Sequence, residues 1–207
     1  MEGFSASIIN FMGTVPQSLQ LFFLFLFSFL EGVPIIGSIL PGGTIAIFAG
    51  SLVDQGILSS VPTIFVIGVA SFLGDITGFL FGRRFKHLKW IQNIVNSEKN
   101  KKSWDLFDRH IAIITIFGKL IPVVRSTPSL FAAVRGVKIR QYLKYSFIGS
   151  ILWAFSGVYA GKFFTYYFGS KAVSFILGII IFSIIIVVGR IFVKQIIRKY
   201  KKAKILK

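Results

Sequence analysis

Four ionisable side chains fall inside or beside strongly apolar stretches of this sequence: Glu31, Asp75, Lys119 and Arg125. A charge at the centre of a bilayer costs roughly 2.5 to 3.5 kcal/mol or more, so such residues are candidates for function. Arginine can bind a phosphate through two parallel N–H bonds, and a carboxylate in an apolar setting can carry a proton or balance a cation. We therefore predict that Arg125 and Lys119 bind a substrate phosphate, while Glu31 and Asp75 serve proton coupling or supply counter-charge.

Structural roles for the same residues stay open. The two cations can simply neutralise the two carboxylates, because buried charges are normally paired. Glu31 can be the carboxylate of a helix end at the headgroup level. Asp75 can pair with Arg83, which follows it by eight residues, or about 12 Å along a helix.

The composition is that of a membrane protein. Of the 207 residues, 54% are hydrophobic, and soluble domains have roughly 45 to 50% apolar residues. The net charge of +17 is concentrated beside apolar spans, since residues 1–82 hold no Lys or Arg, 83–109 hold eight and 194–207 hold seven. Such clusters are typical of cytoplasmic segments facing anionic lipid headgroups. We expect a cytoplasmic loop at 83–110, a cytoplasmic tail at 194–207, and no nucleic-acid partner.

Enzymatic chemistry, metals and cofactors are not expected. The chain has no cysteine, and it has no zinc motif or glycine-rich nucleotide loop. Its two histidines, His87 and His110, lie near basic loop residues. Neither falls within an apolar span, which counts against a Ser-His-acid catalytic set in the membrane.

The apolar runs predict an all-α membrane protein. A helix is expected at 19–30, and uninterrupted spans are expected at 63–82, 145–161 and 172–193. The polar, basic residues 83–110 favour a loop with a short amphipathic helix. A short external loop is expected at 162–171.

Two further apolar stretches, 32–53 and 111–134, are interrupted by helix breakers. The residues expected to shape these hairpins are Pro34, Pro41, Gly42, Gly43, Pro122 and Pro128. A turned backbone at membrane depth needs protein or a water-filled cavity around it. Basic residues flank 111–134 on both sides, so this segment is expected to enter and leave on the cytoplasmic face.

A broken hairpin followed by a span occurs at 31–82 and again at 111–161. One crossing separates the two halves, so they would have opposite orientations. Interrupted segments at corresponding positions of inverted halves point to a transporter site near the bilayer midplane. The sequence thus predicts one transmembrane domain, 1–207, made of two inverted repeats. Each repeat is a re-entrant broken-helix hairpin plus a transmembrane helix, with an additional N-terminal and C-terminal helix.

Small residues recur every four positions in the span at 63–82: Ala70, Gly74, Gly78 and Gly82. A face of small side chains lets another helix approach closely. We predict that this face packs against protein rather than binding a ligand. It could serve internal packing or a homo-oligomer.

These motifs resemble those of the DedA family, whose members are also described as SNARE-associated or VTT-domain membrane proteins. The family pattern Gly-Asp-x-x-Gly-Tyr-x-x-Gly-Arg is similar to residues 74–83, with Phe79 in place of Tyr. The pattern Phe-x-Arg-Phe-x-Pro-x-x-Arg is similar to 117–125, with Lys119 in place of the first Arg. A later Gly and Trp correspond to Gly149 and Trp153.

The first hairpin resembles the family's Glu, Pro and Pro-Gly-acid arrangement through Glu31, Pro34 and Pro41-Gly42. It departs from the family at Gly43, where a Glu or Asp is usual. If members use two hairpin carboxylates, this chain has lost one, which bears on proton coupling and on the substrate. The resemblance also implies two facing re-entrant hairpins.

The resemblance implies a lipid transporter of the bacterial inner membrane. Family members are associated with flipping undecaprenyl phosphate or phospholipids such as phosphatidylethanolamine. One alternative is a proton-coupled transporter of small ions or solutes that uses the same carboxylates. Another is a non-transporting membrane factor that acts through its basic loop and tail.

Overall fold

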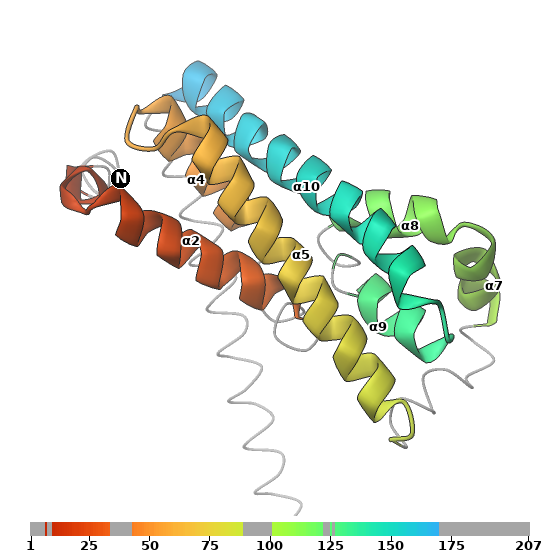
Figure 1. Ribbon diagram of the computed structural model, residues 1–207. Helices are drawn as coiled ribbons and strands as arrows, with labels where there is room; N and C mark the ends of the chain where they lie inside the picture. The colour runs from red at the N-terminus through yellow and green to blue at the C-terminus, as the bar shows by residue number, and fades with distance from the viewer. Residues whose placement is uncertain are drawn as a thin grey trace, which may run out of the picture.

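A computed structural model describes residues 7, 10–33, 43–88, 101–121, 125 and 127–169 (Figure 1). All secondary structure within these ranges is helical, as predicted. Several predicted features lie outside the described residues: Pro34, Pro41, Gly42, Pro122, the span 172–193 and the tail 194–207.

Two described helices are long and apolar enough to cross a membrane, judged by length and composition: α5 (Ser60–Phe85) and α10 (Ile139–Phe168). Both contain the predicted spans and exceed them at each end. The sequence predicts a loop at 162–171. This prediction is wrong for residues 162–168, because they continue α10. The aromatic run there contains no helix breaker before Gly169, whose φ of 57° ends the helix.

Two shorter helices precede α5. The first, α2 (Gln17–Gly32), extends the predicted helix by two residues at each end and therefore includes Glu31. The second, α4 (Thr44–Asp54), begins after Gly43, which has a left-handed φ of 97°. The first apolar stretch is therefore helical on both sides of its proline-rich middle.

The second apolar stretch is also broken into short helices. After the amphipathic α7 (Lys101–Arg109) come α8 (Ile111–Phe117), the 3₁₀ turn η2 (Gly118–Leu120) and α9 (Thr127–Val134). Two short helices and then a long helix thus follow one another twice along the chain. Pro128 is the second residue of α9, where its missing N–H costs no helical hydrogen bond.

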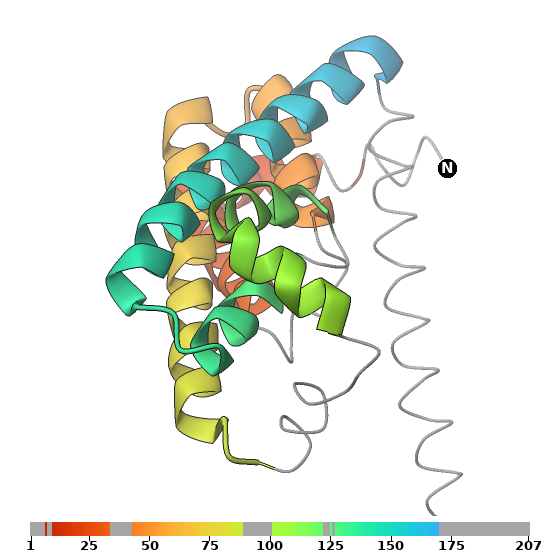
Figure 2. The ribbon, with the colours of Figure 1, turned by 90° about the vertical axis from the view of Figure 1, so that its right-hand side faces the viewer.

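Helix α5 runs between α2 and α10 in Figure 1, and it contacts both of them as well as α9. Helix α10 contacts α4, α5 and α8. In both views α4 lies toward one end of α10, whereas α8 and α9 lie toward the other (Figure 2). The two sets of short helices are therefore held against the same pair of long helices.

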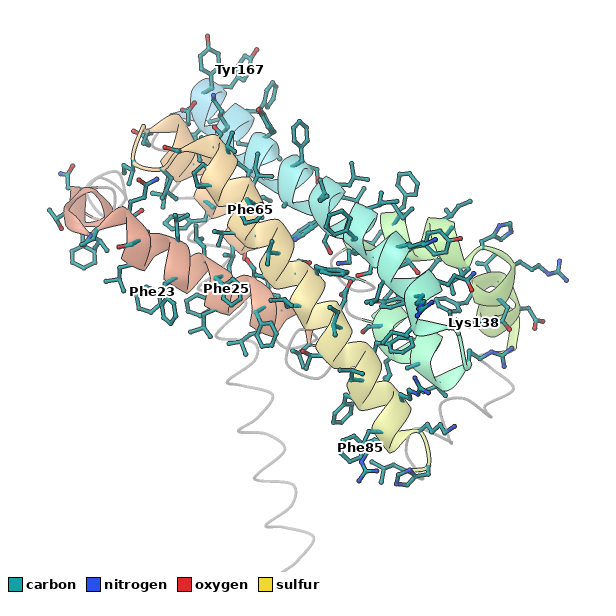
Figure 3. The ribbon with its side chains drawn as sticks, viewed as in Figure 1. Phe23, Phe25, Phe65, Phe85, Lys138 and Tyr167 are labelled. Carbon is teal, nitrogen blue, oxygen red and sulfur yellow. The ribbon has the colours of Figure 1, made fainter. Side chains whose placement is uncertain are left out.

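The two ends of the molecule differ in character. Figure 3 shows Phe85 and Lys138 at one end and Tyr167 at the opposite end. Many large apolar side chains point outward between these ends, among them Phe65 and Phe147. A bilayer would cover such side chains.

Candidate functional site

The four ionisable residues lie on different elements, and all are buried. Glu31 is in the last turn of α2, Asp75 is within α5, Lys119 is in η2, and Arg125 lies between η2 and α9. Their exposed fractions are 2%, 2%, 1% and 3%. Residues from both halves of the sequence therefore contribute charge to the interior.

Asp75 and Lys119 form one ion pair, with 2.5 Å between Lys119 Nζ and Asp75 Oδ2. The ammonium also donates to Ser71 Oγ at 3.3 Å and to Ser150 Oγ at 2.5 Å. Ser146 Oγ donates to the same carboxylate oxygen of Asp75. An ammonium has three N–H donors, so all the donors of Lys119 have partners.

This first pair connects α5, η2 and α10. Ser71 is one turn before Asp75 on α5, while Ser146 and Ser150 are one turn apart on α10. Ser150 Oγ also donates to Ser146 O at 2.8 Å, which fixes its hydroxyl. Because Asp75 pairs with Lys119, the alternative pairing with Arg83 is wrong. Arg83 is exposed near the end of α5.

Glu31 and Arg125 form the second ion pair, with 2.5 Å between Arg125 Nη1 and Glu31 Oε2. The guanidinium also lies over the indole of Trp153, with its central carbon 4.4 Å from the ring centroid. A cation over the face of an indole is attracted by the ring's negative face. Helices α2 and α10 thus hold Arg125 from two sides.

The second pair has unused hydrogen-bonding capacity. Arg125 Nε and Nη2, Glu31 Oε1 and Trp153 Nε1 are buried and have no hydrogen-bond partner among the residues that the structure describes. A buried donor without a partner costs about 1 to 3 kcal/mol, and more when it is charged. Nε and Nη2 form one edge of the guanidinium, and that edge matches two oxygens of a phosphate.

Apolar clusters lie on both sides of the charged residues along the long helices. On α5, Asp75 falls between Ile67 of one cluster and Phe79 of the other. On α10, the two serines fall between Tyr142 and Trp153 in the same way. The charges therefore occupy a polar layer between two apolar cores, where a ligand would meet little competition from water.

Gly43 lies beside Trp153. A Cβ added to it would lie 2.7 Å from Cη2 of the indole, and its φ of 97° disfavours any side chain. An acidic residue here would require both the backbone and the indole to shift. The indole over Arg125 thus gives a physical reason for glycine at this position.

The predicted face of small residues lies at close helix contacts. A Cβ on Gly74 would lie 2.7 Å from Gly32 Cα, where α2 crosses α5. A Cβ on Gly82 would lie 2.9 Å from Ala133 Cβ on α9. Gly78, between them, is also buried. These contacts bring α2 and α9 close to the helix that carries Asp75.

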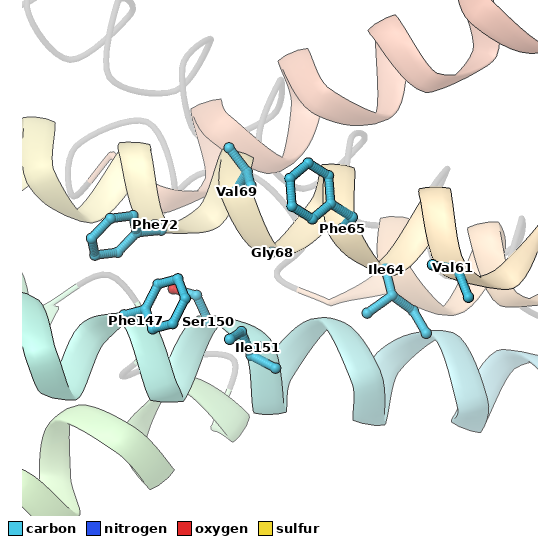
Figure 4. A pocket seen from close by; sticks show the side chains of 9 residues that line it. All are labelled: Val61, Ile64, Phe65, Gly68, Val69, Phe72, Phe147, Ser150 and Ile151. Atoms are coloured by element: carbon cyan, nitrogen blue, oxygen red, sulfur yellow. The ribbon is translucent and has the colours of Figure 1, made fainter.

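A groove of about 330 Å³ lies between α5 and α10 (Figure 4). Its lining is apolar except for Ser150, and it includes the outward-facing Phe65 and Phe147. Ser150 is also a hydrogen-bond partner of Lys119. One side chain therefore separates this groove from the first ion pair.

Sequence reasoning missed the polar partners of the charged residues. Ser71, Ser146 and Ser150 looked like ordinary small residues in apolar helices. The spacing of Ser146 and Ser150, four residues apart on one face, was the available signal. Trp153 was noted only through the family pattern, and nothing in the sequence indicated that it would lie over Arg125.

Comparison with known proteins places this architecture in a family. The pattern of the VTT domain matches residues 40–163, more than half of the chain. No solved structure matches it. Inner membrane protein YghB of Escherichia coli K12 is 27% identical over 140 residues, covering 66% of this chain and 64% of that protein.

Two further relatives from Escherichia coli K12 are similar. Protein DedA is 28% identical over 148 residues, covering 68% of this chain and 67% of DedA. Inner membrane protein YqjA is 24% identical over 135 residues, covering 64% of this chain and 61% of YqjA. The chain thus spans less than two thirds of the length of YghB and YqjA. It belongs to the VTT-domain, or DedA, family of membrane proteins.

Proposed function

We propose that this protein moves a phosphate-bearing lipid between the leaflets of a bacterial inner membrane. The observation that supports this most strongly is the free edge of Arg125, since its Nε and Nη2 are buried without a partner among the described residues. A phosphate could accept two parallel hydrogen bonds from this edge, while the hydrocarbon tail remains in the lipid. Undecaprenyl phosphate and phosphatidylethanolamine are the substrates to test first.

The proposal gives the two cations different roles. Lys119 has three partners, Asp75, Ser71 and Ser150, and so has no donor left for a phosphate. We therefore assign the phosphate contact to Arg125. Lys119 holds the break before Pro122 against α5 and α10.

Glu31 competes with the phosphate for Arg125. The four buried groups carry two negative and two positive charges, so an added phosphate leaves the site net negative unless a proton enters. Glu31 has one oxygen without a partner in the described part of the chain, and it loses attraction from Arg125 when the phosphate binds. A carboxylate that loses a cationic neighbour in an apolar setting takes up a proton more readily. Glu31 would then take up a proton when the lipid phosphate binds to Arg125.

The membrane arrangement is part of the same proposal. The halves 31–82 and 111–161 would be inverted repeats, each a re-entrant hairpin plus a transmembrane helix, and the breaks of the two hairpins would meet near the midplane. Residues 83–110 and the C-terminal tail would face the cytoplasm, because the positive charge is concentrated there. This places Arg125 within reach of headgroups from both leaflets.

The test is reconstitution in liposomes with a leaflet-resolved assay for labelled lipid. Arg125→Lys keeps the positive charge but loses the two parallel N–H donors of the guanidinium edge, so the rate of lipid flipping should fall sharply. Arg84→Lys, which makes the same change at an exposed position on α5, is the matched control and should flip normally. Normal flipping by a folded Arg125→Lys protein would contradict the proposal.

A second candidate is a proton-coupled carrier of small anions. The oxygen of Glu31 and the edge of Arg125 that have no partner among the described residues could serve a small solute equally well. This alternative predicts substrate-dependent proton flux into vesicles whose lipid distribution does not change. Lipid redistribution without added solute favours the first proposal.

A further inference from the structure

A second hollow, of about 480 Å³, lies where α5 ends and α10 begins. Four cations line it, and we call it the basic pocket: Arg83, Lys86, Lys138 and Arg140. No carboxylate is among the described residues that line it. Positive charges gathered at one opening create a field that attracts anions.

The backbone at the start of α10 adds to this field. Lys138 is the N-cap residue, and the pocket is also lined by Ile139 and Arg140 of the first turn. The first N–H groups of a helix have no intrahelical acceptor, and they lie at the positive end of its dipole. The N-cap side chain makes no capping hydrogen bond either. These N–H groups and the side chains of Arg83, Lys138 and Arg140 suit a phosphate better than a carboxylate, because a phosphate offers more acceptor oxygens.

The rest of the lining is apolar. It includes Phe79 from α5, Ala133 from the last turn of α9, and Val137 from the turn that joins α9 to α10. A free inorganic ion would gain nothing from these side chains, whereas a headgroup joined to glycerol and hydrocarbon would cover them. Figure 3 shows Lys138 and Phe85 at this end, where the basic residues would meet the bilayer surface.

We propose that the basic pocket binds the phosphate of an anionic lipid headgroup at the cytoplasmic surface. This goes beyond the proposed function, because binding here requires no transport. Phe79 forms one wall and stacks on Tyr142, with ring centroids 5.1 Å apart. This aromatic pair lies between the basic pocket and Asp75 along α5, and neither Glu31 nor Arg125 lines the basic pocket.

The test is a binding titration of the full-length protein in detergent. The probes are dioctanoyl phosphatidic acid, dioctanoylglycerol without a phosphate, and inorganic phosphate. The variant combines Lys138→Ala with Arg140→Ala. The control is Lys144→Ala, which removes an exposed cation from the same helix outside the pocket.

The double variant should weaken phosphatidic acid binding by about tenfold or more, since two charge-assisted contacts are lost. Lys144→Ala should change it by less than about twofold. The same difference is expected in an Arg125→Lys background, where the transport site is impaired. Lys138→Arg should keep binding, because the charge remains.

Equal affinities in the double variant and in Lys144→Ala would overturn the proposal, provided that both proteins melt at the same temperature. Equal binding of dioctanoylglycerol would overturn the role of the phosphate. If inorganic phosphate binds as tightly as phosphatidic acid, the lipid assignment is wrong. Loss of flipping in Arg125→Lys without loss of this binding would separate the two sites.

Discussion

The two buried ion pairs combine the same kinds of groups but differ in how completely their hydrogen bonds are filled. Lys119 and Asp75 are surrounded by Ser71, Ser146 and Ser150, and every donor of the ammonium is used. Arg125 and Glu31 meet through one nitrogen and one oxygen, and the other edge of the guanidinium is without a partner in the described residues. Burial is nearly equal in the two pairs, so exposure does not explain the difference.

This difference indicates which ion pair is structural and which one exchanges its partner for a ligand. A fully satisfied buried network fixes one arrangement of its helices. An incompletely satisfied pair is costly in the resting protein, and a ligand that supplies the missing partners gains that free energy on binding. We therefore interpret Asp75–Lys119 as the fixed pair and Glu31–Arg125 as the exchanging pair.

The largest effect is expected from breaking the fixed pair. Lys119→Ala leaves Asp75 buried without a cation, and it should lower the free energy of unfolding by about 3 to 5 kcal/mol. Chemical unfolding in detergent measures this. Combining Lys119→Met with Asp75→Leu should restore most of the loss, because no charge is then left unpaired. A fully stable Lys119→Ala protein would show that the fixed pair is not structural.

The next effect concerns the exchanging pair. Arg125→Lys should reduce lipid flipping about tenfold or more, because a lysine cannot present two parallel donors to a phosphate. The protein should still fold, since a cation remains beside Glu31. Leaflet-resolved flipping and thermal melting are measured on the same preparation. If Arg125→Lys flips normally while Lys119→Arg flips faster, the roles of the two cations are reversed.

A smaller effect is expected where α2 approaches the helix of the fixed pair. Gly74→Ala places a methyl group against the backbone of Gly32 and should cost about 1 to 3 kcal/mol of stability. Gly68→Ala is the control on the same helix, because its Cβ would meet only ordinary contacts at 3.7 Å or more. Equal stabilities of the two variants would contradict the close approach of the helices.

The smallest effect is expected from Glu31→Gln. The neutral side chain competes less well for Arg125, so lipid phosphate should bind more tightly by a factor of about three to ten. Flipping by the unmodified protein should rise as the pH falls, because protonation of Glu31 releases Arg125. The Glu31→Gln variant should lose this pH dependence. A retained pH dependence would assign the proton to another group.

The sequence predicted the long helices well because uninterrupted apolar length is a local property. The spans within α5 and α10 were found in this way, although α10 continues through the aromatic residues up to Phe168. The breaks could be placed from Pro and Gly. The continuation of α2 through Glu31 could not be predicted, because Gly32 and Pro34 suggested that the helix ends earlier.

The four charged residues of the site could be named from the sequence, but their pairing could not. Pairing depends on contacts between residues far apart in the chain, such as Glu31 with Arg125. Distance along one helix suggested Arg83 for Asp75, whereas packing between helices brought Lys119 to it. Ser71, Ser146 and Ser150 carry no charge, and the four-residue spacing of Ser146 and Ser150 was too weak a signal by itself to assign them to the site.

The central claim is that the unpartnered edge of Arg125 binds a lipid phosphate while Lys119 does not. Solid-state NMR of the protein in bilayers containing undecaprenyl phosphate can test it by ³¹P–¹⁵N dipolar coupling, with the arginine and lysine side chains labelled separately. We predict a coupling from lipid phosphorus to the guanidinium of Arg125, seen as the difference between the unmodified protein and Arg125→Lys, and none to the ammonium of Lys119. A phosphate coupled to Lys119, or guanidinium couplings that are identical in the unmodified protein and in Arg125→Lys, would contradict the account.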